Sequence, residues 1–354
     1  MKWTRRKVLV VAGAAVVVVA AIVVGVVTLT GGEQEVPPIP GAVNPDESRP
    51  VTNKVWPATL VLHVEIDPAK QANQPSDVAL VGGEMFLTDT IGGRLFVLSA
   101  DGKSSRVLDS QVDPKLALKG PMAIASHGGQ LYVADSDNGR VVIVTPSGTV
   151  SREIILAKGD PADAKQPRPI GIAVWDDGSF VVSDANNNRL LKYDADGNML
   201  WTVGSGSRDT GEGSFNSPVG VSLDKDGNVY VVDMLNSQVK KYSADGKFLS
   251  AFGGAGDTAG GFSRAKAVAE DDLGNVYVSD GLQAAVQVFD QAGNFVGFIG
   301  RKDPADPNST SLFDTPHGLK IVDGKLYVVD RFNGLFVFEL PTSQPAGSQP
   351  ATSD

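Results

Sequence analysis

One phrase recurs six times along the chain, roughly every 47 residues, and no other feature constrains the fold as strongly. In the third copy, Pro-Ile-Gly-Ile-Ala at 169–173 leads to Phe-Val-Val-Ser-Asp at 180–184. In the fourth copy, Pro-Val-Gly-Val at 218–221 leads to Val-Tyr-Val-Val-Asp at 229–233. A period of about 40–50 residues made of short strands predicts a β-propeller rather than a doubly wound sheet or a helical solenoid. The aspartate that ends the second segment of each copy occurs at Asp89, Asp135, Asp184, Asp233, Asp280 and Asp330.

Within a copy, the pattern indicates strands alone. The apolar segments are about four to seven residues long, rich in Val, Ile, Tyr and Phe, and bounded by Gly, Asp or Asn. Asp-Gly pairs such as Asp177-Gly178 and Asp245-Gly246 separate consecutive segments, and they supply the positive φ that tight hairpin turns need. Three hairpins join four strands into one blade, so the sequence predicts six four-stranded blades.

The sixth copy is incomplete. After Pro341 the chain turns to Ser, Thr, Gln and Pro, and no fourth strand follows the segment 335–339. A segment with apolar residues at every second position, 58–66, precedes the first copy and has no blade of its own. A ring that stays open leaves the hydrogen-bonding groups of a strand edge unpaired. We therefore expect residues 58–66 to close the ring beside 335–339.

The repeated phrase resembles the repeat of the NHL family of six-bladed propellers. Its elements are Pro-x-Gly-Ile-Ala, then Val-Tyr-Val-x-Asp, then Asn-x-Arg, and the resemblance covers about residues 56–340. The fifth copy departs from it, since Ala265-Lys266-Ala267 replaces Pro-x-Gly. The resemblance implies an all-β, six-bladed propeller of four-stranded blades. It implies little about chemistry, because one fold of this kind serves many functions. The arginine position is occupied by Arg94, Arg140, Arg189, Gln238, Ala285 and Leu335.

The N-terminal residues predict where the protein works. Residues 1–7 form a basic segment, and residues 8–30 carry no charge. At about 1.5 Å per helical residue, the latter span about 34 Å, enough for a bilayer core. The apolar region of a secretory signal is shorter, about 7–15 residues. We predict an uncleaved transmembrane anchor, with a cleaved signal and a secreted protein as the alternative. The positive-inside rule then predicts a single-pass protein of a bacterial cell membrane, with residues 1–7 in the cytoplasm and the propeller outside.

Composition accounts for the remaining segments. Residues 31–55 are rich in Pro and acidic residues and are typical of an extended stalk, whereas residues 341–354 are typical of a disordered tail. The chain has no cysteine, which excludes disulfides, thiolate metal sites and a lipoprotein anchor. The formal net charge of −10 argues against a nucleic-acid partner.

An enzymatic function is the alternative that a second resemblance suggests. Peptide-amidating lyases are similar propellers whose channel metal is held by histidines that directly follow the proline of the repeat. The equivalent positions here are Ser76, Met122, Ile170, Val219, Lys266 and His317. Only one is histidine, and His63 and His127 belong to other parts of the repeat, so the sequence predicts neither a metal site nor a cofactor. A lyase or hydrolase that uses the central channel remains the alternative.

Two further patterns are interpreted as structural. Aspartate and arginine recur five residues apart, as in Asp184 and Arg189, and a pair that recurs in three of the six copies indicates turn capping and ion pairing rather than one active site. The acidic turns, for example Asp224 with Asp226 and Asp271-Asp272, match no complete calcium loop. No serine nucleophile with a neighbouring base is recognisable, and we predict no catalytic residue.

A binding surface is the remaining functional prediction. Strand order places the start of each first strand, the end of each second strand and the long connections between blades on one face. Variable loops on a rigid frame are common recognition sites. We therefore predict a non-enzymatic binding or scaffold module for an extracytoplasmic protein, peptide or polysaccharide, with the membrane as a partner through the N-terminal helix. The candidate binding residues on this face are Arg168, Arg264, Lys266, His317, Arg331 and Phe332.

Overall fold

The computed structural model describes residues 54–66, 71–158, 165–301 and 310–345. The basic segment 1–7, the anchor 8–30 and almost all of the stalk 31–55 lie outside these residues, as does most of the tail. Within the described ranges, no helix is both long enough and apolar enough to cross a membrane.

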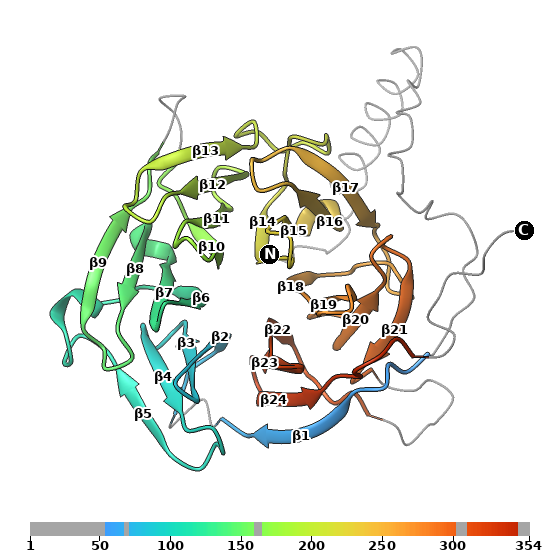
Figure 1. The fold of residues 1–354 in the computed structure, drawn as a ribbon, viewed down its shortest axis with the longest axis horizontal. Coiled ribbons are helices and arrows are strands. Elements are labelled where there is room, and N and C mark those ends of the chain that lie inside the picture. The colour runs from blue at the N-terminus through green and yellow to red at the C-terminus, as the bar shows by residue number, and fades with distance from the viewer. Residues whose placement is uncertain (1–53, 67–70, 159–164, 302–309, 346–354) are drawn as a thin grey trace, which may run out of the picture. The chain divides into compact units, whose positions relative to one another are not determined.

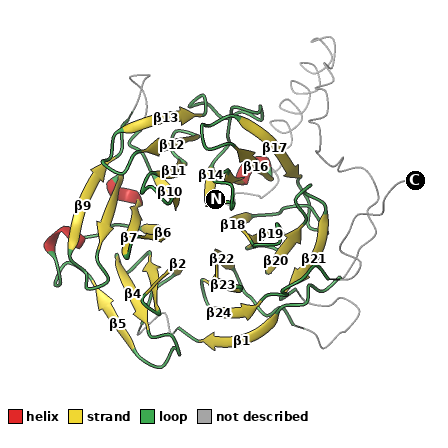
Figure 2. Ribbon diagram, in the orientation of Figure 1, coloured by secondary structure: helices red, strands yellow, loops and turns green. Residues whose placement is uncertain are grey.

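The described strands form six four-stranded antiparallel sheets, arranged as blades around a central axis (Figure 1). The innermost strand of each blade is the first strand of a sequence copy. Figure 2 shows that strands and loops make up nearly all of the ring. The helical elements of the described residues are three single 3₁₀ turns: η1 (Pro114–Leu116), η2 (Ser136–Asn138) and η3 (Met234–Asn236).

The first three blades follow the chain in order, from the innermost strand to the outermost. Blade 1 contains β2 (Pro75–Val81), β3 (Glu84–Asp89), β4 (Arg94–Leu98) and β5 (Ser105–Leu108). Blade 2 contains β6 (Pro121–His127), β7 (Gln130–Asp135), β8 (Arg140–Val144) and β9 (Val150–Ile155). Blade 3 contains β10 (Pro169–Val174), β11 (Phe180–Asp184), β12 (Arg189–Tyr193) and β13 (Met199–Val203).

The last three blades repeat this arrangement, except that blade 6 takes its outer strand from the N-terminal side. Blade 4 contains β14 (Pro218–Leu223), β15 (Val229–Asp233), β16 (Gln238–Tyr242) and β17 (Phe248–Gly253). Blade 5 contains β18 (Ala265–Glu270), β19 (Val276–Asp280), β20 (Ala285–Phe289) and β21 (Phe295–Ile299). Blade 6 contains β22 (Pro316–Val322), β23 (Lys325–Asp330), β24 (Gly334–Glu339) and β1 (Thr59–Val64).

Closure of the ring by β1 confirms the prediction from the incomplete sixth copy. β1 pairs antiparallel with β24, from Thr59 opposite Glu339 to Val64 opposite Leu335. The residues before β1 reach the neighbouring blade, since the Trp56 N–H donates to the Phe298 carbonyl at 2.8 Å. The Trp56 side chain is buried between blades 5 and 6. We call residues 54–64, which include Trp56 and β1, the clasp. The clasp therefore contacts two blades, 5 and 6, rather than one.

The core lies between the blades. Middle strands such as β11 are buried along their whole length, because a neighbouring blade covers each face of the sheet. Apolar clusters accordingly combine residues of adjacent blades. One joins Tyr132 of blade 2 to Phe180 of blade 3, and another joins Tyr230 of blade 4 to Phe289 of blade 5. Such stacking around a ring explains why the strands carry nearly continuous apolar runs.

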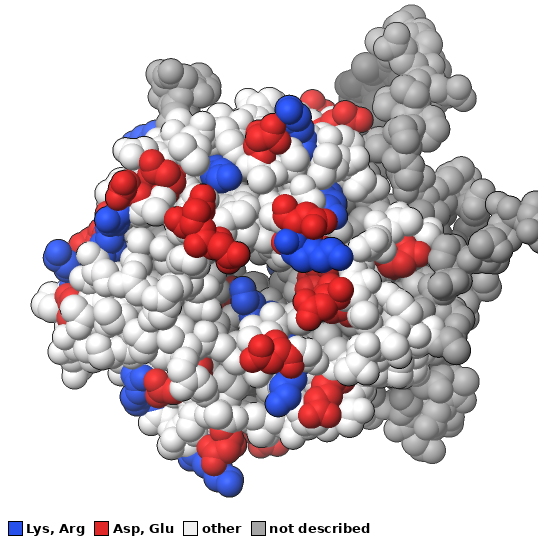
Figure 3. Space-filling model, in the orientation of Figure 1, with Lys and Arg blue, Asp and Glu red and all other residues white. Residues whose placement is uncertain are grey.

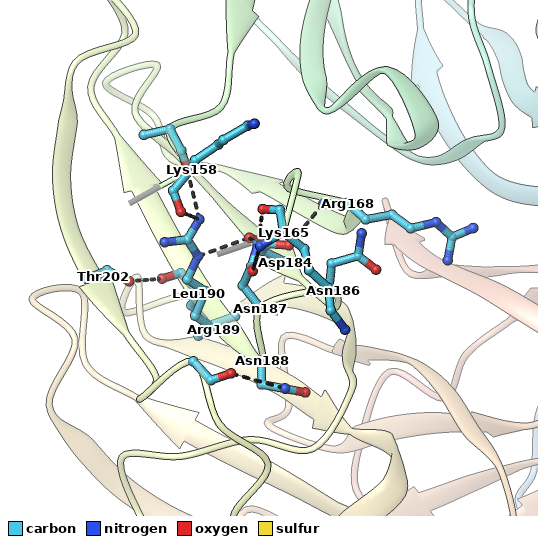
Figure 4. Close-up of polar contacts among 12 residues, drawn as sticks. Lys158, Lys165, Arg168, Asp184, Asn186, Asn187, Asn188, Arg189, Leu190 and Thr202 are labelled. Atoms are coloured by element: carbon cyan, nitrogen blue, oxygen red, sulfur yellow. Dashed lines mark hydrogen bonds and ion pairs between the residues drawn. The ribbon is translucent and has the colours of Figure 1, made fainter. Parts of the chain in front are cut away.

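The repeated aspartates form the predicted ion pairs in blades 1 to 3, and they also fasten the connections between blades. Asp184 is fully buried; its carboxylate accepts hydrogen bonds from the Arg168 N–H at 2.9 Å and the Asn187 side chain at 2.7 Å (Figure 4). The Arg189 Nε lies 2.9 Å from the same carboxylate, and its Nη2 donates to the carbonyls of Ala157 and Lys158. One ion pair thus joins two strands of the blade to the loop that arrives from the previous blade.

The equivalent aspartates elsewhere use different donors. Arg94 and Arg140 pair with the aspartates of blades 1 and 2. In blade 4, where Gln238 occupies the arginine position, Lys240 supplies the cation from two residues further on, 3.0 Å from Asp233. The aspartates of blades 5 and 6 accept backbone N–H groups only. All six blades therefore have the buried aspartate, but among the described residues only blades 1 to 4 pair it with a lysine or arginine.

Removal of β1 is expected to destabilise the propeller. A chain that lacks residues 1–67 would expose the edge of β24 and the cavity that Trp56 fills, whereas a chain that lacks only 1–50 would keep both. We expect a lower Tm and aggregation for the shorter chain in calorimetry and size-exclusion chromatography. Equal Tm values for the two truncations would contradict the clasp.

Candidate functional site at the mouth of the channel

A β-bulge shapes each inner strand at the point where it enters the channel. In all six, the register against the second strand shifts directly after the first residue of the strand. A bulge leaves a residue unpaired and redirects its side chain. The redirected residues are those that follow the first position of the strand, and all six line one cavity at the centre of the ring: Ser76, Met122, Ile170, Val219, Lys266 and His317.

The next position of the inner strand controls how closely neighbouring blades approach. A Cβ atom on Gly171 would lie 2.3 Å from the Val219 carbonyl oxygen, and one on Gly318 would lie 2.5 Å from that of Ser76. Real Cβ atoms do not come so close, so these contacts require glycine. In copies 3, 4 and 6, which have glycine at this position, the Pro-x-Gly phrase is therefore a packing requirement of the channel wall.

The channel holds two cavities in line. The one at the face that bears the long loops between blades has a volume of about 180 Å³, and the one toward the face of tight turns has about 130 Å³. Asp77 lines both, so it lies where they meet. Figure 3 shows one face of the disc, on which acidic and basic side chains surround a central hollow. We call the group Arg264, Lys266, His317 and Arg331 the cationic mouth: Lys266 and His317 line the first cavity, and the charges of Arg264 and Arg331 act on Lys266.

His317 is buried and neutral. Its Nδ1 lies 3.0 Å from the Ser76 carbonyl oxygen, an acceptor, so Nδ1 carries the proton and donates. Burial lowers the pKa of His317 to about 3, and the positive charges of Arg331 and Lys266 add to this effect. The bond joins the inner strand of blade 6 to that of blade 1, which gives His317 a structural role in ring closure. Its Nε2 remains an acceptor at the cavity.

Lys266 and Arg331 are cations without an acidic partner. Burial lowers the pKa of Lys266 to about 8, with further contributions from Arg264 and Arg331, while Asp280 acts in the opposite direction. Burial also lowers the pKa of Arg331, whose Nε is buried without a hydrogen-bond partner. In the described part of the chain, no ion pair joins Lys266, Arg264 or Arg331 to a carboxylate within 4.0 Å. Positive charge is therefore concentrated here without a carboxylate in direct ion-pair contact among the described residues.

The remaining candidate residues lie on the same face with different surroundings. Arg168 lines the cavity, but its Nε is 3.0 Å from Asp137, so its charge is already paired. Phe332 follows Arg331 after the end of β23, and its side chain is 52% exposed. The structure thus brings Arg168, Lys266 and His317 to the cavity itself, and it places Phe332 beside the cationic mouth.

Asp77 is the channel residue that the sequence interpretation missed. It occupies the glycine position of the first copy, and its Oδ2 accepts a hydrogen bond from the Ile124 N–H of the next inner strand at 3.0 Å. Burial raises the pKa of Asp77 to about 7, although the Ile124 bond and the charge of Lys320 oppose that shift. The signal was present: Pro75-Ser76-Asp77 has a carboxylate at a position where the other five copies have only Gly or Ala.

Within the described residues, no three His, Cys, Asp or Glu side chains are grouped to hold a metal ion. The second cavity does contain Glu270, whose pKa burial raises to about 7 and whose Oε2 has no hydrogen-bond partner. It also contains Lys320, whose pKa burial lowers. The tight-turn end of the channel therefore contains both an acidic and a basic side chain, whereas Lys266 gives the mouth a positive charge.

Comparison with known proteins agrees with the fold. The family model described as NHL repeat matches residues 167–193 and 215–242, which are the first three strands of blades 3 and 4 with the residues that lead into them. The chain is a six-bladed β-propeller. Two of its six blades, blades 3 and 4, match the NHL-repeat model. A comparison with curated proteins finds no match.

Solved structures of similar fold include enzymes. Virginiamycin B lyase from Staphylococcus aureus is 12% identical, with 80% of this chain and 100% of that chain covered and a TM-score of 0.53. A gluconolactonase from Xanthomonas campestris is 16% identical over 83% and 99%, with a TM-score of 0.57. A protein of unknown function from Bacteroides thetaiotaomicron is 15% identical over 79% and 75%, with a TM-score of 0.58. At these identities the likeness shows the fold alone.

The raised pKa of Asp77 predicts how stability depends on pH. The unfolded chain loses the Asp77 proton near pH 4, whereas the folded chain keeps it to about pH 7. The folded state thus binds more protons in this window, so the free energy of unfolding falls as pH rises through it. Asp77→Asn keeps an acceptor for the Ile124 N–H and removes the titration. We expect the variant to be more stable than the parent at pH 8, by about 1 kcal/mol or more, and equal to it near pH 3.

Urea unfolding at the two pH values measures this difference. Asp272→Asn, at an exposed position on the tight-turn face, is the control for loss of one carboxylate. If Asp77→Asn were less stable than the parent at pH 8, the attraction between Asp77 and Lys320 would outweigh the cost of burial.

Proposed function

We propose that this chain is a membrane-anchored, extracytoplasmic binding module that holds a protein, peptide or envelope polymer at the face bearing the long loops between blades. The observation that carries the proposal is the cationic mouth. Burial and then the charges of Arg264 and Arg331 lower the pKa of Lys266, burial and then Arg264 lower that of Arg331, and within the described ranges no ion pair joins these side chains to a carboxylate. In a chain of net charge −10, such a cluster is a local exception that a ligand of opposite charge would stabilise.

The surroundings of the mouth suit recognition. Partly buried cations without partners cost free energy in the unliganded protein, and an entering anion offsets that cost. Arg331 is adjacent to the exposed Phe332, and arginine and aromatic side chains are favoured anchors at interfaces. The long connections that surround this face can vary in shape while the blades stay rigid.

A lyase or hydrolase that uses the channel is the second candidate. The observation that favours it is the pKa of Lys266, about 8, because an amine close to neutrality can act as a base or nucleophile. Against it, the low pKa of His317 makes this residue a weak base, and its Nδ1 is committed to Ser76. Lys266 contacts Met234 Sδ at 3.5 Å rather than an orienting carboxylate. A binding function therefore explains more features of the channel mouth than a catalytic function does.

Substitutions on the two faces test the proposal. Crosslinking of the full chain in its native membrane would identify the partner, whose affinity is then measured with purified components. We expect Lys266→Ala, Arg331→Ala and Phe332→Ala to weaken binding, with a true anchor costing about 2 kcal/mol, near 30-fold in Kd. Asp226→Asn and Asp272→Asn, on the tight-turn face, should leave Kd unchanged. If the variants on the tight-turn face abolished binding by folded protein and the other three did not, the assignment of the binding face would be wrong. Substrate turnover that requires Lys266 would favour the enzyme.

The proposed location has a separate test. Protease added to intact cells or spheroplasts should cut between Glu33 and Lys54 and release a folded propeller, because the described core begins at Trp56. Immunoblotting of the supernatant measures the release. Recovery of the fragment only after lysis would place the propeller in the cytoplasm.

A further inference from the structure

We propose that the cationic mouth and the apolar wall opposite it form a receptor for the C-terminal residue of a peptide, with the terminal carboxylate at the cations and an apolar side chain against the wall. This inference rests on the proposed binding function and specifies the ligand that it takes.

The cavity is divided by chemical character. Lys266 on β18 lines the cavity without an ion-pair partner and has Arg331, directly after β23, close by; Arg168, on the blade 3 side, also lines it but is paired with Asp137. Its apolar side chains come from blades 2 to 4: Met122, Ile170, Val219 and Met234. A ligand that satisfies both sides carries a negative charge and an apolar group within a few ångströms of each other. The last residue of a peptide has this arrangement when its side chain is apolar.

The polar groups match a peptide terminus in kind. A carboxylate offers two acceptor oxygens, and the mouth offers the Lys266 ammonium and the Arg331 guanidinium, whose Nε–H has no acceptor. The amide N–H of the terminal residue needs an acceptor, and His317 offers Nε2, since its Nδ1–H is donated to Ser76. Each donor and acceptor of the terminus thus has a counterpart.

An acidic sugar fits this cavity less well. Its ring hydroxyls would face Met122, Ile170 and Val219, which offer no hydrogen-bond partner, and a buried hydroxyl without a partner costs free energy. An isolated phosphate would meet the cations but would leave the apolar wall unused. The apolar wall therefore favours a peptide over either of these ligands.

The size of the cavity suits a single residue. Its volume of about 180 Å³ is below the range of about 300–1,000 Å³ that encloses a drug-sized ligand. The terminal residue would enter the mouth, and the preceding residues would lie over the loops between blades and beside Phe332. We expect specificity to reside mainly in the last residue.

Calorimetric titration of the full chain in detergent tests the proposal. The probes are the tetrapeptide Ala-Ala-Ala-Leu with a free carboxylate, the same peptide as its C-terminal amide, trigalacturonate and inorganic phosphate. We expect the free acid to bind at least ten-fold more tightly than the amide. Lys266→Met and Arg331→Met should abolish this preference. Lys320→Met is the matched control, because Lys320 lies in the same channel but lines the other cavity.

A second readout separates direct contact from a change of shape. A carboxylate beside Lys266 raises the pKa of the ammonium from about 8, so binding at pH 8 takes up protons. The binding enthalpy should then vary with the ionisation enthalpy of the buffer in the parent chain and in Lys320→Met, and not in Lys266→Met. Thermal melting confirms that each variant is folded, and Lys266→Arg should retain preference for the free acid.

The outcomes distinguish this inference from the proposed function. Equal affinity for acid and amide, or binding of trigalacturonate or phosphate without binding of the peptide acid, overturns the peptide-terminus inference. If the chain still crosslinks to a partner through the Lys266 and Arg331 face in that case, the binding function stands and only its ligand changes. If substitutions on this face leave the crosslinked partner unaffected, the proposed function itself fails.

Discussion

The arrangement of the blades depends on six buried carboxylates. Each aspartate that ends a second strand has no exposed surface, and each accepts a backbone N–H from the loop that arrives from the preceding blade. A buried charge is tolerated only when its hydrogen-bonding capacity is used, so the loop must adopt one path. That path sets where the following inner strand begins. The position of every residue in the channel mouth therefore follows from a hydrogen bond made outside the channel.

The β-bulges at the starts of the inner strands direct six side chains into the cavity at the channel mouth. Because each register shift follows the first residue of an inner strand, the fold presents six neighbouring positions whose side chains vary without altering the sheets. Glycine at the next position lets the inner strands of adjacent blades approach, as at Gly171 and Gly318. Four of the six positions carry side chains without charge or imidazole, and Lys266 and His317 break that pattern on one side only. The uneven distribution of polar groups around the mouth thus results from two residues, Lys266 and His317, in a ring of six nearly equivalent blades.

The sequence predicted the fold in detail because the relevant signals are local or periodic. The repeat length, the Asp-Gly turns and the orphan strand at 58–66 sufficed for six blades and the clasp, and strand order sufficed to bring Lys266 and His317 to one cavity. The electrostatics could not be predicted in this way. That Arg168 is paired and Arg331 is not depends on distances between different blades. Asp77 was missed because its role depends on how close β6 lies to β2. The anchor at 8–30 lies outside the described residues and stays a prediction.

The clasp also determines how the molecule would bear a pull. A force applied to the chain before residue 54 first meets the two bonds between that segment and β21, Phe298 N–H to the Lys54 carbonyl and Trp56 N–H to the Phe298 carbonyl, both 2.8 Å. Only when these yield does the load reach the ladder between β1 and β24. The contacts with β21 and the ladder with β24 lie in different blades, and the buried Trp56 lies between them along the chain. A pull therefore loads the first before the second. A pull on the chain before residue 54 would therefore break the contact with the outer strand of blade 5 before it opened the propeller.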